Sequence, residues 1–310
     1  MMGLLLLLAF GLGLYASFLI ASTYSTLRFP RRRTYSWAVS RGVPGDPGEL
    51  TPALAFRRFG FESRGRRLIA WDIDGNCPTG PVAVLTHGWS DSKVGALARV
   101  SALAPMCSRI VAWDLPGHGE SPGACELGMR EGEDLVALLE SLDGPGSARI
   151  VLFGWSLGAG VSLVAGNQWQ NRDRLAGVIA EAPYRLVETP ARNVMRAQRS
   201  PWRLNLPVAI WLIRRRAGVS AGALAQFDRA GWARELPCPL LVLHGTDDVV
   251  CPLEDARAIA NAKAGGMLVE IESARHNDVW VRPSTRERAI DAVRQFLANP
   301  DQATGVGCSS

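Results

Sequence analysis

Short apolar runs alternate with amphipathic stretches along most of this 310-residue chain, and this alternation restricts the possible fold more than any other feature. Eight runs read as strands: RRFGFES, RRLIAWDID, GPVAVLTHG, RIVAWD, IVLFG, LAGVIAEAP, PLLVLHG and MLVEIES. Intervening stretches such as EGEDLVALLESL have helical spacing of apolar residues, and residues 93–104 are also expected to form a helix. The pattern predicts an α/β fold with a mostly parallel eight-stranded sheet, helices on both faces and an antiparallel start. Ligands of such sheets bind at the carboxyl ends of the strands.

The first 27 residues contain no charged side chain, and Arg28, Arg31, Arg32 and Arg33 follow immediately. About 20 apolar residues suffice to span a bilayer. Because a basic start and a clean A-x-A cleavage site are both lacking, we expect an uncleaved transmembrane helix at 1–27 rather than a signal peptide of an exported protein. The arginines then place the globular domain on the cytoplasmic side.

The rest of the chain divides into three parts. We expect a basic juxtamembrane linker at 28–53, one α/β domain at 54–299 and a flexible tail at 300–310. Within the domain, residues 184–235 interrupt the alternation and hold ten arginines against three acidic residues. We expect this segment to form a short helical lid.

Basic, tryptophan-rich segments such as this lid are attracted to anionic membranes. A solvated basic face over ordinary packing explains the composition equally well. Nucleic-acid binding is not expected, since no such motif is present. The six cysteines are scattered without metal-ligand spacing, so we expect reduced thiols and no metal site.

The segment GWSLG, residues 154–158, lies between the apolar run IVLF and a stretch of helical character. A nucleophilic serine on a sharp strand-to-helix turn needs glycines around it, because side chains there would clash with neighbouring backbone. Ser156 is therefore the candidate nucleophile, with Gly154 and Gly158 forming the turn. The alternative is an ordinary serine at the start of a helix. The pattern does not explain Trp155.

The segment THGWSDS, residues 86–92, ends another predicted strand. Its glycine allows the backbone to approach the site, so the amides of Trp89 and Leu157 are candidates for an oxyanion hole. We expect His87 to order this loop. His118, in DLPGHGES, precedes the serine, which is the wrong order for the catalytic base.

An acid and a histidine follow Ser156 at two further strand ends, in HGTDDVVCP and SARHNDVW. Serine needs a base to remove its proton, and the base needs a carboxylate to orient it. His276 is the candidate base, and His244 is expected to be structural. Asp247 and Asp248 are both candidates for the acid.

Together these motifs resemble the α/β-hydrolase superfamily over about residues 54–299. The resemblance implies that the acid is Asp248, three residues after Gly245 and four before Pro252, with Asp247 second. It also implies that the enzyme needs no cofactor. The anchor, the short lid and the HND-x-W ending are similar to membrane-anchored ABHD-type serine hydrolases, which include depalmitoylases and lipid esterases.

The leading hypothesis is an esterase, lipase or thioesterase that forms an acyl-enzyme on Ser156, with a small-molecule or lipid acyl substrate near a membrane. One alternative is a peptidase acting on short peptides with the same triad. Another is a catalytically silent adaptor on the same fold. The sequence specifies neither the acyl chain, the leaving group nor the oligomeric state.

Overall fold

The computed structural model describes residues 1–142, 148–225 and 227–298. Its centre is one eight-stranded sheet with the strand order β1-β2-β4-β3-β5-β6-β7-β8. Strand β2 runs antiparallel to β1 and β4, and all other neighbouring strands are parallel. The strands are β1 (Phe56–Ser63), β2 (Arg66–Asp74), β3 (Val82–Thr86), β4 (Arg109–Trp113), β5 (Ile150–Trp155), β6 (Leu175–Glu181), β7 (Leu240–Gly245) and β8 (Met267–Ile271).

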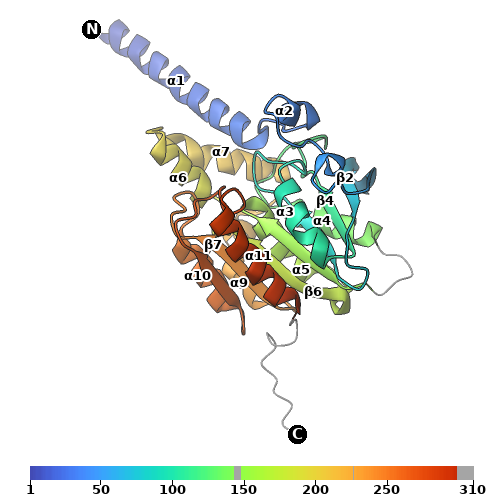
Figure 1. Ribbon diagram of the computed structural model, residues 1–310. Helices are drawn as coiled ribbons and strands as arrows, with labels where there is room; N and C mark the ends of the chain where they lie inside the picture. Colours follow the sequence, from blue (N-terminus) through green and yellow to red (C-terminus); the bar gives the residue numbers. More distant parts are fainter. Residues whose placement is uncertain (143–147, 226, 299–310) are drawn as a thin grey trace.

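Helices cover both faces of this sheet (Figure 1). One face packs against α4 (Glu131–Ser141), α5 (Leu157–Gln168), α9 (Arg229–Arg234) and α10 (Leu253–Ala262). The other packs against α2 (Tyr35–Val39), α3 (Leu97–Leu103) and α11 (Pro283–Ala298). Successive residues of a strand serve opposite cores: Val84 belongs to the first and Leu85 to the second. The predicted fold class is confirmed.

The helical insertion lies between β6 and β7, as the sequence predicts. It contains α6 (Thr189–Ala197), α7 (Trp202–Ala217), α8 (Ala221–Ala225) and α9. One helix begins later than predicted. We expect a helix from residue 93, but residues 92–97 form i→i+3 turns and α3 starts only at Leu97.

Helix α1 (Met2–Arg28) is long and apolar enough to cross a membrane, with a mean hydropathy of 2.4 and none of its most apolar stretch buried. Only its last turns contact the domain, where α1 lies beside α7 (Figure 1). Leu27 enters the core of the domain. The amide of Asn205 donates to the hydroxyl of Thr23 at 2.9 Å.

The segment 28–53 is folded onto the domain. Ala38 of α2 is fully buried in the second core, and a 3₁₀ helix follows at Pro47–Glu49. The cysteines at 77, 107, 125, 238 and 251 are free thiols. Cys308 and the predicted tail lie outside the described residues.

Candidate active site

Ser156 lies between β5 and α5 in a strained backbone conformation, with φ 53° and ψ −113°. Side chains rarely adopt this region. A Cβ on Gly154 would lie 2.1 Å from the carbonyl oxygen of Gly158, and one on Gly158 would lie 1.9 Å from that of Thr86. The turn therefore requires both glycines. The N–H of Ser156 donates to the carbonyl of Glu181 at 2.8 Å, which fixes the turn against β6.

The structure brings His276 and Asp248 to Ser156 from the loops after β8 and β7. Nε2 of His276 lies 3.1 Å from Oγ of Ser156, and its Nδ1 lies 2.7 Å from Oδ2 of Asp248. The other carboxylate oxygen of Asp248 accepts the N–H groups of Val250 and Cys251, both at 2.8 Å. These bonds hold the carboxylate toward the imidazole.

Asp247, the second candidate for the acid, is exposed. Its carboxylate accepts a hydrogen bond from the hydroxyl of Thr246 at 3.3 Å and, within the described part of the chain, makes no hydrogen bond or ion pair with the imidazole of His276. The local reason is the tight loop, in which the N–H of Asp248 donates to Gly245. The geometry therefore favours Asp248 as the partner of His276.

The loop at residues 86–92, which contains His87 and Gly88, passes directly beside Ser156. A Cβ on Gly88 would lie 3.3 Å from Cβ of Ser156, so only glycine leaves ordinary space at this position. Within the described part of the chain, the N–H groups of Trp89 and Leu157 have no hydrogen-bond acceptor. The N–H of Leu157 is free because the first amides of a helix have no acceptor inside it.

The three other histidines are buried and bonded within loops. His87 contacts the carbonyl of Gly88 at 2.7 Å and accepts the N–H of Leu115 at 3.0 Å. His118 lies 3.0 Å from the carbonyl of Pro116 and accepts the N–H of Ser90. Burial lowers the pKa of His87 to about 4 and that of His118 to about 3, so both are neutral near pH 7.

His244 lies behind the acid rather than beside the serine. Its Nε2 is 3.0 Å from the carbonyl of Cys251 and 3.7 Å from Oδ2 of Asp248. Burial lowers the pKa of His244. The structural roles expected for His87 and His244 agree with these contacts, and His118 likewise bonds to loop backbone.

A buried ion pair behind Ser156 explains Trp155, which the sequence pattern leaves open. Arg99 and Glu181 form a bidentate salt bridge with N···O distances of 2.8 and 2.5 Å. The guanidinium of Arg99 lies 4.0 Å from the ring centroid of Trp155, and the indole N–H of Trp280 donates to Glu181 at 2.7 Å. The tryptophan beside the nucleophile thus packs on a buried charge.

The end of α1 and the residues after it contact the loop at residues 86–92, which carries the candidate oxyanion donor Trp89. The indole N–H of Trp89 donates to the carbonyl of Leu27 at 3.0 Å. Arg33 pairs with Asp91 at 3.1 Å, and Asp91 also accepts the indole N–H of Trp155 at 3.2 Å. Sequence reasoning misses these contacts because they join segments about 60 residues apart, and no local pattern marks them.

Asp248, Cys251 and His276 bring potential metal-ligand atoms within 4.8 Å of one another. Oδ2 of Asp248 and Nδ1 of His276 already share a hydrogen bond. A metal ion would have to displace that proton and also take the proton of a buried thiol, whose pKa burial raises. The geometry fits a hydrogen-bonded relay better than a metal site.

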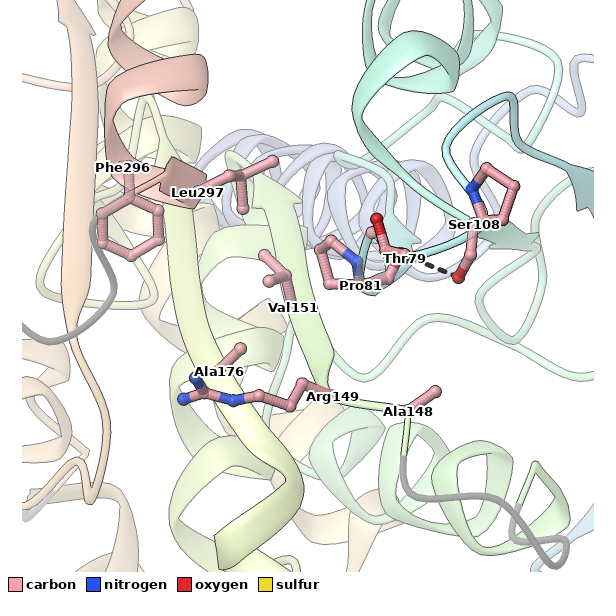
Figure 2. Close-up of a pocket in the computed structure, with 11 residues that line it drawn as sticks. Thr79, Pro81, Ser108, Ala148, Arg149, Val151, Ala176, Phe296 and Leu297 are labelled. Carbon is pink, nitrogen blue, oxygen red and sulfur yellow. Dashed lines mark hydrogen bonds between the residues drawn. The ribbon is translucent and has the colours of Figure 1, made fainter.

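A separate pocket of about 380 Å³ lies at the amino ends of the strands, opposite to the ends that lead to Ser156. Figure 2 shows Pro81, Val151 and Ala176 around it, at the beginnings of β3, β5 and β6, with Phe296 and Leu297 of α11. Ser156, His276 and Asp248 instead follow strand ends. This pocket is therefore not part of the arrangement around Ser156.

Comparison with known proteins agrees with the fold. Residues 83–294 match the model of the alpha/beta hydrolase family. A pimeloyl-[acyl-carrier protein] methyl ester esterase of Methylococcus capsulatus is 27% identical over 257 residues, which cover 71% of this chain and 96% of that protein. The Pyrococcus furiosus esterase Pf2001 has a similar structure, with a TM-score of 0.64, 17% identity and coverage of 86% of this chain and 99% of that one.

A shorter match is with the dihydrolipoyllysine-residue acetyltransferase component of the acetoin cleaving system of Pseudomonas putida. It is 41% identical over 106 residues, which make up 33% of this chain but only 27% of that protein. The family match covers more than half of the chain and includes the strand ends that carry Ser156, Asp248 and His276. The chain therefore belongs to the alpha/beta hydrolase family.

Proposed function

We propose that this protein is a serine hydrolase that cleaves a carboxylic ester or thioester through Ser156, His276 and Asp248. The observation that carries the proposal is the continuous relay from Oγ of Ser156 through both nitrogens of His276 to Asp248. Serine is a weak nucleophile near neutral pH, and a hydrogen-bonded imidazole with its own carboxylate partner is the arrangement that activates it.

In this mechanism Oγ of Ser156 attacks the acyl carbonyl carbon while Nε2 of His276 takes the serine proton. The N–H groups of Trp89 and Leu157 stabilise the resulting oxyanion. His276 then gives its proton to the departing alcohol or thiol, which leaves the acyl group on Ser156. A water molecule, deprotonated by His276, hydrolyses this acyl-enzyme. Asp248 keeps Nδ1 of His276 protonated throughout.

The esterase relative from M. capsulatus, matched over nearly its whole length, supports an ester of an acyl chain as the substrate. The peptidase alternative would need a free acidic group to bind a substrate amine. Glu181 is 1% exposed and is paired with Arg99 and Trp280, so it does not offer one. A silent adaptor would have no reason to keep the strained turn at Ser156 and its bonded partners.

We further propose that α1 anchors the protein in a membrane, as in ABHD-type hydrolases, with the domain at 54–299 on the cytoplasmic side. The buried Leu27 and the bond between Thr23 and Asn205 favour retention of α1 over signal-peptide cleavage. Residues 184–235 would act as the lid. A protease restricted to the non-cytoplasmic side should leave the domain intact. Digestion of the domain by this protease would contradict the proposed orientation.

The triad is tested with a fluorophosphonate probe on the full-length protein. Wild type should be labelled, and Ser156→Ala should not be. The matched control is Ser162→Ala, which removes a buried hydroxyl from the same helix, α5, and should leave labelling unchanged. Labelling that survives in Ser156→Ala would defeat the assignment.

The substrate class is tested with p-nitrophenyl esters of rising chain length, measured beside an acylated cysteine peptide and a phospholipid. A preference for one of these would separate esterase, thioesterase and lipase activity. His276→Ala should lower kcat by several orders of magnitude on every substrate that the enzyme accepts.

A further inference from the structure

A basic hollow of about 620 Å³ lies next to the C-terminal end of α1, and none of the proposed catalytic residues lines it. We call it the arginine hollow. It is lined by Arg31, Arg32, Arg33, Trp37, Arg41 and Ser90.

The arginine hollow is held in shape by contacts from three directions. Arg32 donates to the carbonyls of Gly119 and Ser121 at 3.2 and 3.0 Å. Arg33 pairs with Asp91. The guanidinium groups of Arg33 and Arg41 each lie 4.9 Å from the ring centroid of Trp37. The hollow is therefore partly preorganised by backbone and aromatic contacts.

Its charge is not balanced. Four guanidinium groups line it, and Arg33 alone has a carboxylate partner among the described residues. Like charges gathered around one concave surface repel each other and raise the local concentration of anions. Guanidinium groups bind phosphate oxygens with paired hydrogen bonds. A phosphate group is thus the ligand that this chemistry fits best.

The position of the arginine hollow points to the source of the phosphate. It follows directly on the apolar helix α1, at the depth where lipid headgroups lie when such a helix spans a bilayer. The same segment of the chain exposes apolar side chains: Phe29, Tyr35, Val39 and Val43. A soluble anion would explain the arginines but not these apolar neighbours. A bilayer surface explains both.

We propose that the arginine hollow binds the phosphate of an anionic membrane lipid. Ser90 lines the hollow and is the next residue after Trp89, so the lipid would lie against the loop that carries the proposed oxyanion donor. This proposal requires α1 in a membrane but does not depend on ester hydrolysis, and binding can be measured without a substrate.

The test uses the full-length protein in an uncharged detergent, titrated with dihexanoyl phosphatidylglycerol, dihexanoyl phosphatidylcholine and inorganic phosphate. Arg31→Gln/Arg41→Gln removes two charges from exposed positions of the hollow. Arg234→Gln/Arg288→Gln removes the same charge from exposed positions on α9 and α11 and serves as the matched control. Thermal unfolding of each variant checks that the fold is intact.

Wild type and control should bind phosphatidylglycerol alike, and the hollow variant should bind it about 30-fold more weakly. Phosphatidylcholine should bind more weakly than phosphatidylglycerol to wild type, because its choline cation faces the arginines. Equal affinity of the three proteins for phosphatidylglycerol would overturn the site. Inorganic phosphate that binds as tightly as phosphatidylglycerol would overturn the lipid as the ligand.

Discussion

At the scale of single residues, the buried ion pair of Arg99 and Glu181 lies next to Ser156 and makes each of the two charges dependent on its partner. Both are buried, and the carbonyl of Glu181 holds the N–H of Ser156. A buried charge that loses its partner is strongly destabilising, whereas removal of both charges together is often tolerated. A change that unbalances the buried pair is therefore expected to disturb the backbone that holds Ser156 as well.

We predict that Glu181→Gln lowers the free energy of unfolding by about 3–5 kcal/mol, because Arg99 remains buried without a counter-charge. The double variant Arg99→Met/Glu181→Leu should recover much of this loss. Urea unfolding of the wild type, Glu181→Gln, the single variants Arg99→Met and Glu181→Leu, and the double variant measures the coupling. Additive losses would show that the two side chains do not depend on each other.

Burial of His118 gives stability a pH dependence of defined sign. Its pKa is about 3 in the folded protein and about 6.5 in an unfolded chain. The unfolded state therefore binds more protons between these values, so stability is fully present above about pH 6.5 and falls as the pH drops. Burial raises the pKa of Glu131 to about 7, which acts in the opposite direction.

We predict that His118→Gln, which offers a donor and an acceptor at similar positions, loses less stability than wild type between about pH 7 and pH 4. Glu131 is unchanged in both proteins, so its contribution cancels in the difference. Urea unfolding at several pH values measures this. Parallel curves for the two proteins would contradict the proposed cost of charging His118.

The sequence predicts the candidate site well because each of its members follows a strand. Order and spacing indicate Ser156 and His276, the resemblance to the α/β-hydrolase superfamily favours Asp248 over Asp247, and the three side chains lie together in the structure. Arg99 and Glu181 are not predictable, since they are 82 positions apart and neither lies in a motif. Contacts of this kind depend on which helix covers which strand.

At the scale of elements, the turn between β5 and α5 is a tightly constrained connection, with no room for a side chain at Gly154 or Gly158. Gly158→Ala would place a Cβ 1.9 Å from the backbone oxygen of Thr86, which cannot move without shifting β3. We predict a marked loss of fluorophosphonate labelling and a lower free energy of unfolding. Circular dichroism would show whether the fold persists.

The control for this change is Gly231→Ala on α9, where a new Cβ meets nothing within 4 Å. A glycine inside a helix costs about 0.5–1 kcal/mol relative to alanine, so this variant should be slightly more stable and fully labelled. If both alanine variants behaved alike, steric conflict would not explain the requirement for Gly158.

All eight strands are predicted from their apolar runs, but their order in the sheet is not. The position of β4 between β2 and β3 arises because the first hairpin adds antiparallel to β4, which no composition reveals. The late start of α3 has a similar origin. The N–H of Lys93 donates to the buried Asp114 at 2.8 Å, which holds residues 92–97 in turns.

At the scale of the whole molecule, the N-terminal helix and the enzyme domain are not separate bodies joined by a free linker. Removal of residues 2–18 deletes only exposed side chains. Removal of residues 2–33 also deletes the buried Leu27 and the bonds of Arg32 and Arg33. The sequence predicts the apolar helix and the basic linker but not this docking.

We predict that the shorter deletion keeps the unfolding free energy of the domain, whereas the longer one lowers it by about 3 kcal/mol or more. Esterase activity on a soluble ester should follow the same order, because the indole of Trp89 loses its partner only in the longer deletion. Equal stability of the two truncated proteins would contradict a structural role for residues 19–33.

The docking of α1 onto α7 also determines how an anchored enzyme would search for substrate. A domain on a loose tether samples a hemisphere of orientations and heights above the bilayer. Here the bonds from Thr23, Leu27 and Arg33 leave little freedom to swivel. An anchored enzyme would then diffuse in a plane, with the proposed nucleophile Ser156 at one fixed height. Selectivity among lipids would depend on how deep in the membrane the scissile ester lies.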